Sequence, residues 1–252
     1  CSIYFLVVNI ISGVIGFSVT KELNGNKKER RELPEIELKE YTNKYICLIA
    51  FIICLGILLF GSKIITKFWM LIVFYVVILS LMIGVFYKQL IHDFKIFKSY
   101  FKEYFVLILK TWGKALVLIM ITTIIIQIIT NTTQANNQIA LQNSFNSNPV
   151  FIAILAMFYA PIAEELMFRG VFRKFIKNKK LFVIVSGVVF GLMHVIDDSK
   201  TLAEFSYVFV YSILGIYLAG IYAKTNNLCT NIFMHFMQNT LSVIGMILLM
   251  FM

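Results

Sequence analysis

Residues 160–170, with the sequence APIAEELMFRG, place two adjacent carboxylates and a guanidinium inside an otherwise apolar stretch of chain. A charged side chain at the centre of a bilayer costs roughly 3 kcal/mol on insertion scales, so this cluster needs a reason. Glu165 and Arg169 are four residues apart and can pair on one helix face, whereas Glu164 points about 100° away around the helix. The arginine can therefore hold Glu165 while Glu164 stays free for acid–base chemistry.

Two further apolar segments carry polar groups that could join Glu164. One contains His194, and the other contains His235 and Asn239 with the four-residue spacing that places both on one helix face. At 1.5 Å per residue, all four side chains lie roughly 10–20 Å from the basic ends of their helices. A single histidine in a membrane helix is usually a packing residue, but four polar groups from three helices at one depth predict a shared pocket.

The local sequence around these residues favours close approach and an opened backbone. Gly187, Gly191 and His194 share a helix face, and small residues let a neighbouring helix come near. Ala156, Ala160 and Glu164 form a similar line. Pro161 cannot donate a backbone hydrogen bond, so we expect a kink there, and such a break is tolerated where it lines protein or a wet cavity.

The chemistry that fits these residue types is hydrolysis of an amide by water. A desolvated glutamate has a raised pKa and is a better base near neutral pH, so Glu164 would deprotonate water that His194 helps to orient. His235 and the Asn239 amide would donate to the oxyanion. Glu164, His194 and His235 could instead ligate zinc or another divalent metal with one position left open. The residue types are compatible both with a water bound to a metal and with a water activated by the side chains alone.

Composition places this site in a membrane protein. The 252-residue chain is 60% hydrophobic and only 14% charged, far from the average of a soluble domain. The formal charge of +10 does not indicate nucleic-acid binding, because Lys and Arg lie between apolar runs, as the positive-inside rule expects. We therefore predict an all-α, multi-pass protein of the cell membrane, of bacterial plasma-membrane type, whose partners are lipids and a membrane-associated peptide or protein.

Hydropathy predicts a bundle of about eight transmembrane helices with both termini outside. Residues 2–20 are expected to be a membrane helix rather than a signal peptide, and a basic amphipathic helix at 88–103 is expected to lie in the membrane interface. The division expected is N-terminal helices over 1–103 and a catalytic bundle over 104–252. The spans are expected near 2–20, 45–60, 68–87, 104–130, 150–172, 181–196, 202–223 and 229–252.

The motifs resemble the CPBP family, the CAAX-protease and bacteriocin-processing family also called Abi. The resemblance rests on EExxxR at Glu164, FxxxH from Phe190 to His194 and HxxxN from His235 to Asn239, in this order on successive apolar helices. It covers about residues 150–245. It implies an intramembrane endopeptidase in which Glu164 and His194 activate water and His235 and Asn239 bind the oxyanion or share a metal.

The resemblance also implies supporting roles for Glu165, Arg169 and Phe190, and it leaves the substrate open between a prenylated protein and a small peptide. Two other readings of the residues compete with it. One is a non-proteolytic immunity or regulatory protein that binds a peptide or a membrane partner. The other is a transporter, which would string polar groups along a path and could show inverted repeats. The clustering at one depth favours the hydrolase.

Overall fold

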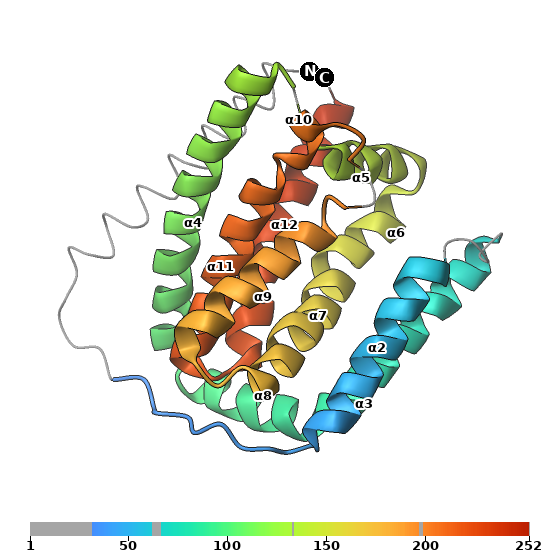
Figure 1. Cartoon of the computed structure of the whole chain (residues 1–252). Coiled ribbons are helices and arrows are strands. Elements are labelled where there is room, and N and C mark those ends of the chain that lie inside the picture. The colour runs from blue at the N-terminus through green and yellow to red at the C-terminus, as the bar shows by residue number, and fades with distance from the viewer. Residues whose placement is uncertain (1–31, 62–66, 133, 197–198, 252) are drawn as a thin grey trace.

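The computed structural model describes residues 32–61, 67–132, 134–196 and 199–251, and every regular element in these ranges is helical (Figure 1). This confirms the predicted all-α bundle. In chain order the elements are α2 (Lys44–Gly61), α3 (Phe68–Ser99), α4 (Phe101–Thr130), α5 (Asn136–Ser147), α6 (Pro149–Ile154), η1 (Leu155–Tyr159), α7 (Ala160–Glu165), η2 (Leu166–Val171), α8 (Phe172–Phe175), α9 (Lys179–Met193), α10 (Leu202–Phe205), α11 (Val208–Thr225) and α12 (Leu228–Met250).

Five helices in the described ranges are long and apolar enough to cross a membrane. They are Phe68–Ser99, Phe101–Thr130, Pro149–Phe175, Leu202–Thr225 and Leu228–Met250. Large apolar side chains point outward from the bundle, as a bilayer requires. The chain is therefore a multi-pass membrane protein. Of the other predicted spans, α2 contains a shorter apolar helix, Lys44–Leu58, α9 has 15 residues, and residues 2–20 lie outside the described ranges.

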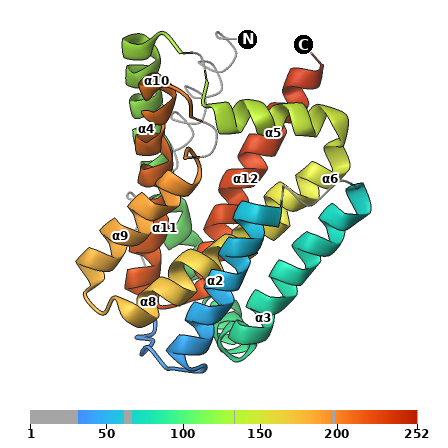
Figure 2. The same cartoon turned by 45° about the vertical axis from the view of Figure 1, so that its right-hand side comes forward.

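The C-terminal helices surround the polar residues of the site. In Figures 1 and 2, α9, α11 and α12 pack with the rod formed by α6, η1, α7, η2 and α8, and α2 and α3 run side by side along its other flank. The predicted glycine face lies where α9 meets α11. A Cβ on Gly187 would lie 2.5 Å from Cγ1 of Ile216, and one on Gly191 would lie 2.8 Å from the carbonyl oxygen of Val208. These two backbones can approach so closely only because both α9 positions are glycine.

The rod from Pro149 to Phe175 changes its helical pitch twice. The π-helical segment η1 immediately precedes the turn that contains Pro161, so the interruption expected at this proline takes the form of a widened turn. A second π-helical segment, η2, follows Glu165. A side chain from another helix bonds a carbonyl in each segment: Asn239 Nδ2 donates to Ala156 O at 2.8 Å, and Ser186 Oγ donates to Phe168 O at 2.9 Å.

Two features differ from the sequence predictions. Residues 88–99 are not a separate amphipathic helix, because α3 continues without a break to Ser99 and its last turns pass under the bundle in Figure 1. The buried face there includes Gln89 and Asp93, whereas Phe94 is exposed. Asp93 Oδ2 accepts from Leu228 N at 2.9 Å, so this polar face supports the start of α12. The uncharged stretch after α4 contains the helix α5, which the sequence analysis did not predict.

Residues 32–43 have no regular structure and lie across the end of the bundle where α8 and the last turns of α3 meet. Thr42 Oγ1 donates to Val85 O at 2.7 Å, and Asn226 Nδ2 donates to Ile36 O at 2.6 Å. Lys177 and Glu40 form an exposed ion pair at 3.6 Å. We call this end of the bundle the base. Figure 2 shows α5 at the opposite end.

Candidate active site

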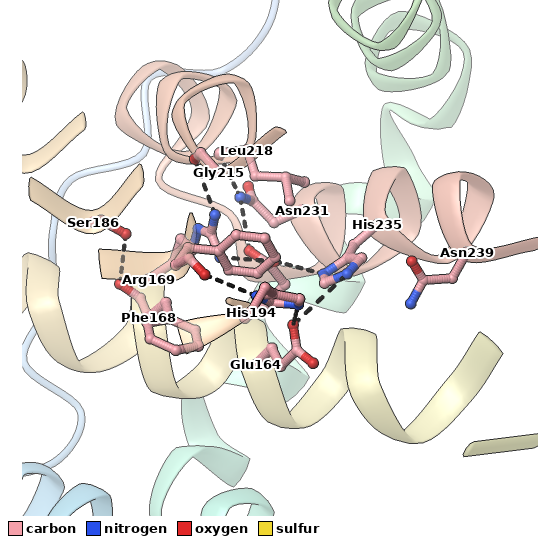
Figure 3. A network of polar contacts seen from close by, with 12 residues as sticks. Glu164, Phe168, Arg169, Ser186, His194, Gly215, Leu218, Asn231, His235 and Asn239 are labelled. Atoms are coloured by element: carbon pink, nitrogen blue, oxygen red, sulfur yellow. Dashed lines mark hydrogen bonds and ion pairs between the residues drawn. The ribbon is translucent and has the colours of Figure 1, made fainter. Parts of the chain in front are cut away.

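Glu164, His194 and His235 converge from three helices on one point inside the bundle (Figure 3). Glu164 Oε2 lies 3.7 Å from Nε2 of His194 and 3.9 Å from Nε2 of His235. These separations exceed a direct hydrogen bond but suit a small molecule held between the three atoms. Glu164 Oε2 is buried and has no hydrogen-bond partner. The Glu164 side chain keeps 26% of its surface exposed, and both of its ion-pair partners are histidines rather than Lys or Arg.

The partners of the two Nδ1 atoms fix which nitrogen each histidine presents. His194 Nδ1 lies 2.8 Å from the carbonyl oxygen of Phe190, and His235 Nδ1 lies 2.8 Å from Oε1 of Glu165. A carbonyl or carboxylate oxygen can only accept, so both Nδ1 atoms carry the hydrogen. Nε2 of each ring therefore faces Glu164, as an acceptor when the ring is neutral and as a donor when it is protonated.

Glu165 lies at the centre of a fully buried polar network. Its Oε1 accepts from Arg169 Nη1 at 3.1 Å as well as from His235, and its Oε2 accepts from Asn231 Nδ2 at 3.2 Å. Glu165, Arg169 and Asn231 are all 0% exposed. Arg169 Nη2 also donates to the carbonyl oxygen of Gly215 at 3.0 Å, which ties the rod to α11. The adjacent carboxylates thus face different surroundings, as the sequence predicted.

Asn239 lies one helical turn from His235 on α12 and lines the same cavity as Glu164 (Figure 3). One hydrogen of its Nδ2 amide is used by the carbonyl oxygen of Ala156. The other hydrogen is available to a bound molecule. Asn239 therefore combines a structural bond to η1 with a free donor at the cavity wall.

Aromatic rings hold both imidazoles in place. The Phe190 ring centroid lies 4.4 Å from that of His194 and 5.7 Å from that of His235, and Arg169 Cζ lies 4.7 Å from the Phe190 centroid on another side. On its other flank His194 stacks on Tyr211, with ring centroids 4.9 Å apart. Phe190 is fully buried and lies against His194, His235 and Arg169.

The predicted metal set of Glu164, His194 and His235 does not have ligand geometry here. Zinc needs each donor atom about 2.0–2.2 Å from the ion. The described residues contain no group of three or more His, Cys, Asp or Glu side chains arranged to hold a metal ion. The separations of 3.7 and 3.9 Å allow a water molecule to lie between the three groups.

Sequence reasoning missed two residues that support the site. Asn231 precedes His235 by four residues, as His235 precedes Asn239, so all three share one face of α12. This four-residue spacing is the feature of the sequence that could have identified Asn231 as a site residue. The second residue is Ser186, whose bond to the carbonyl oxygen of Phe168 depends on the π-helical segment, which no sequence pattern predicts.

A cavity of about 620 Å³ contains the site. Its wall includes Glu164, both histidines and Asn239, together with apolar and uncharged polar side chains from α4, α5, α11 and α12. The volume is in the usual range for pockets that bind small molecules or peptide side chains.

Residues 146–241 match the family described as type II CAAX prenyl endopeptidase Rce1-like. This part of the chain is therefore similar to the Rce1-like family. All of the predicted site residues lie within the matched range, whereas α2, α3 and α4 precede it. The Rce1-like segment thus contributes the rod, α9, α11 and most of α12.

Curated bacterial proteins are also similar to the chain. The "Putative membrane peptidase YdiL" of Bacillus subtilis is 29% identical over 44% of this chain and 43% of its own length. Two Lactococcus lactis proteins, UPF0177 protein YvdC and UPF0177 protein YxdF, are 26% and 34% identical over 50% and 30% of this chain. These matches span 46% and 38% of the two Lactococcus proteins, so each match covers less than half of its relative. No solved structure matches the chain significantly.

Proposed function

We propose that this protein is an intramembrane endopeptidase that hydrolyses a peptide bond of a membrane-associated substrate with water activated by Glu164. The observation that carries the proposal is the position of the unpaired Glu164 carboxylate, which faces Nε2 of His194 and of His235 inside a membrane-embedded cavity. The similarity of residues 146–241 to the Rce1-like family supports the reaction class.

In the first step, a water molecule between Glu164 and the two Nε2 atoms attacks the carbonyl carbon of the substrate. Glu164 takes one proton from this water as its oxygen bonds to carbon, and the carbonyl oxygen becomes an oxyanion. His194 orients the water by accepting its other hydrogen at Nε2. The fixed tautomer makes this possible, because Nδ1–H is held by the Phe190 carbonyl oxygen.

In the second step, the tetrahedral intermediate collapses and the carbon–nitrogen bond breaks. The proton taken by Glu164 passes to the leaving nitrogen, so Glu164 returns to its ionised state and the products are a carboxyl and an amine. The free Asn239 hydrogen and a protonated His235 Nε2 would donate to the oxyanion. Glu165 and Arg169 act indirectly, since they position the His235 ring.

Comparison of the membrane-bound peptides in cells that produce the wild-type chain or Glu164→Gln tests this proposal. We expect at least one peptide to accumulate uncut in the variant, and the purified wild-type protein to cleave that peptide in detergent. Prenylated and unmodified forms of the same peptide would then decide the substrate type. Identical peptide sets, with both proteins present at equal levels in the membrane, would favour the non-proteolytic immunity or regulatory role.

A further inference from the structure

The cavity extends from the site toward one end of the bundle only. Along α12 its wall runs from His235 through Ser242 to Leu249, a rise of about 21 Å at 1.5 Å per residue. Along α4 it runs from Leu116 to Gln127, again toward the end of the helix that adjoins α5. The cavity therefore leads from Glu164 toward the end capped by α5.

The opposite end of the cavity is closed by the buried network. Glu165, Arg169 and Asn231 have no exposed surface, and none of the three lines the cavity. Beyond them, at the base, a separate pocket admits about 20 Å³, and neither Glu164 nor either site histidine lines it. A substrate can reach Glu164 from the α5 end but not through the base.

The two ends of the bundle carry different charges. A large group of basic side chains gathers at the base, on the last turns of α3, the start of α4, α8 and the start of α9, whereas Lys67 and Lys200 lie toward the other end. The group consists of Lys88, Lys95, Lys98, Lys102, Arg173, Lys174, Lys177, Lys179 and Lys180. The helix α5, by contrast, contains no charged residue. Under the positive-inside rule the base faces the cytoplasm, and the α5 end faces away from it.

The cavity wall also selects by charge. Glu164 is its one Asp, Glu, Lys or Arg side chain among the described residues. The α5 end instead supplies amides and hydroxyls, including Gln134, Asn137, Gln138 and Ser144, which can pair with peptide backbone groups. A charged side chain entering this cavity would lose its hydration without gaining an opposite partner beyond the catalytic carboxylate.

We propose that the site receives an uncharged peptide segment that enters from the membrane face opposite the cytoplasm. This inference rests on the proposed function only in naming a peptide as the occupant. The peptide reaches Glu164 through the half of the bundle nearer α5. The amides of α5 contact the peptide backbone, and the apolar walls formed by α4 and α12 contact its side chains.

Cysteine labelling in intact bacterial cells tests the direction of entry. The native cysteines are replaced by serine, and a membrane-impermeant maleimide is applied to Ser144→Cys at the cavity end and to Lys180→Cys at the base; both positions are exposed. We expect Ser144→Cys to be labelled in intact cells and Lys180→Cys only after permeabilisation. The reverse pattern would overturn the proposal whether or not the protein cleaves peptides.

Protection of a cavity cysteine tests the charge selection without requiring catalysis. The purified Glu164→Gln, Ser242→Cys protein is treated with maleimide in the presence of an end-blocked hexapeptide of Leu, Ala and Asn, or of the same peptide with a central Lys or Asp. We expect the neutral peptide to protect Ser242→Cys at an at least tenfold lower concentration than either charged one. Equal protection by all three, or none by the neutral one, would overturn the inference. If the neutral peptide protects the cysteine but the wild-type protein never cleaves it, the result would contradict the proposed peptidase activity and not the charge selection.

Discussion

His235 Nδ1 donates to Oε1 of Glu165 at 2.8 Å, while Nε2 of the same ring lies 3.9 Å from the neighbouring carboxylate of Glu164. One imidazole therefore connects two adjacent glutamates that have different surroundings. Glu165 is buried among permanent hydrogen-bond donors, and Glu164 faces the cavity. This division assigns positioning to one carboxylate and proton transfer to the other, and it can be tested at each residue separately.

Replacing the cavity carboxylate should remove activity and leave the fold intact. Glu164→Gln keeps the side-chain volume but cannot accept a proton from water, so we expect peptide hydrolysis to fall by at least about 10²-fold. Thermal unfolding should change little, because Glu164 Oε2 has no hydrogen-bond partner to lose. Hydrolysis of a peptide identified in the cellular comparison measures the effect. The matched control is Glu37→Gln, an exposed glutamate at the base. Near-full activity of Glu164→Gln would rule out the mechanism.

Breaking the buried ion pair of Glu165 and Arg169 should mainly lower the stability of the protein. Arg169→Ala leaves Glu165 as a buried charge without its cation, and Glu165→Gln leaves Arg169 in the same state, so each should cost about 3–5 kcal/mol. Arg169→Ala also removes the bond to the Gly215 carbonyl oxygen. We expect a lower midpoint of thermal unfolding in detergent and a lower yield from membranes. An Arg169→Ala protein with wild-type stability but no activity would instead place the guanidinium in direct contact with the substrate.

The contact between α9 and α11 should tolerate no added carbon atom at its glycines. Gly187→Ala would place Cβ 2.7 Å from the backbone nitrogen of Ile216, which cannot move as a flexible side chain can. Overpacking of this kind costs typically about 1–3 kcal/mol, and the resulting shift of α9 would displace His194 from Glu164. We therefore expect losses of both stability and activity.

Gly220→Ala on α11 is the matched control for this contact. Nothing lies within 4 Å of a Cβ at that position, so the substitution should be neutral or slightly stabilising. Equal effects of Gly187→Ala and Gly220→Ala would mean that close helix approach does not position His194.

Much of the site could be predicted because its geometry follows from helical periodicity. The four-residue spacing of Glu165 and Arg169, and of His235 and Asn239, specifies which side chains share a face without knowledge of the tertiary structure. The glycines of α9 indicated where a second helix would come close, and the structure places α11 there. Apolar composition was sufficient to predict the membrane bundle.

The parts that were missed depend on contacts between distant segments. The face of α3 with Gln89 and Asp93 is polar in sequence but buried in the fold, because Asp93 bonds Leu228 N at the start of α12. Periodicity alone therefore predicted a false helix boundary at residue 88. The helix α5 has the composition of a loop, and its buried Phe145 packs against Val243 and Met246 of α12. Tertiary packing outweighed local propensity in both places.

Asn239 and Ser186 offer a paired test of the oxyanion donor. Each side chain donates one hydrogen bond to a carbonyl of a π-helical segment, Asn239 to Ala156 O and Ser186 to Phe168 O. Ser186→Ala leaves a buried acceptor unpaired and should lose about 1–3 kcal/mol of stability, whereas the Asn239 bond is half-buried and its loss should cost about 0.5–1.5 kcal/mol. Only Asn239 lines the cavity.

If Asn239 donates to the oxyanion, Asn239→Ala should also lower kcat by about 10²–10³-fold, while KM changes little, because the bond forms only in the transition state. Ser186→Ala should keep kcat within a few-fold of wild type once both are measured well below their unfolding temperatures. Equal reductions in kcat would mean that Asn239 acts only by holding η1 in place, and the oxyanion would then depend on His235 alone.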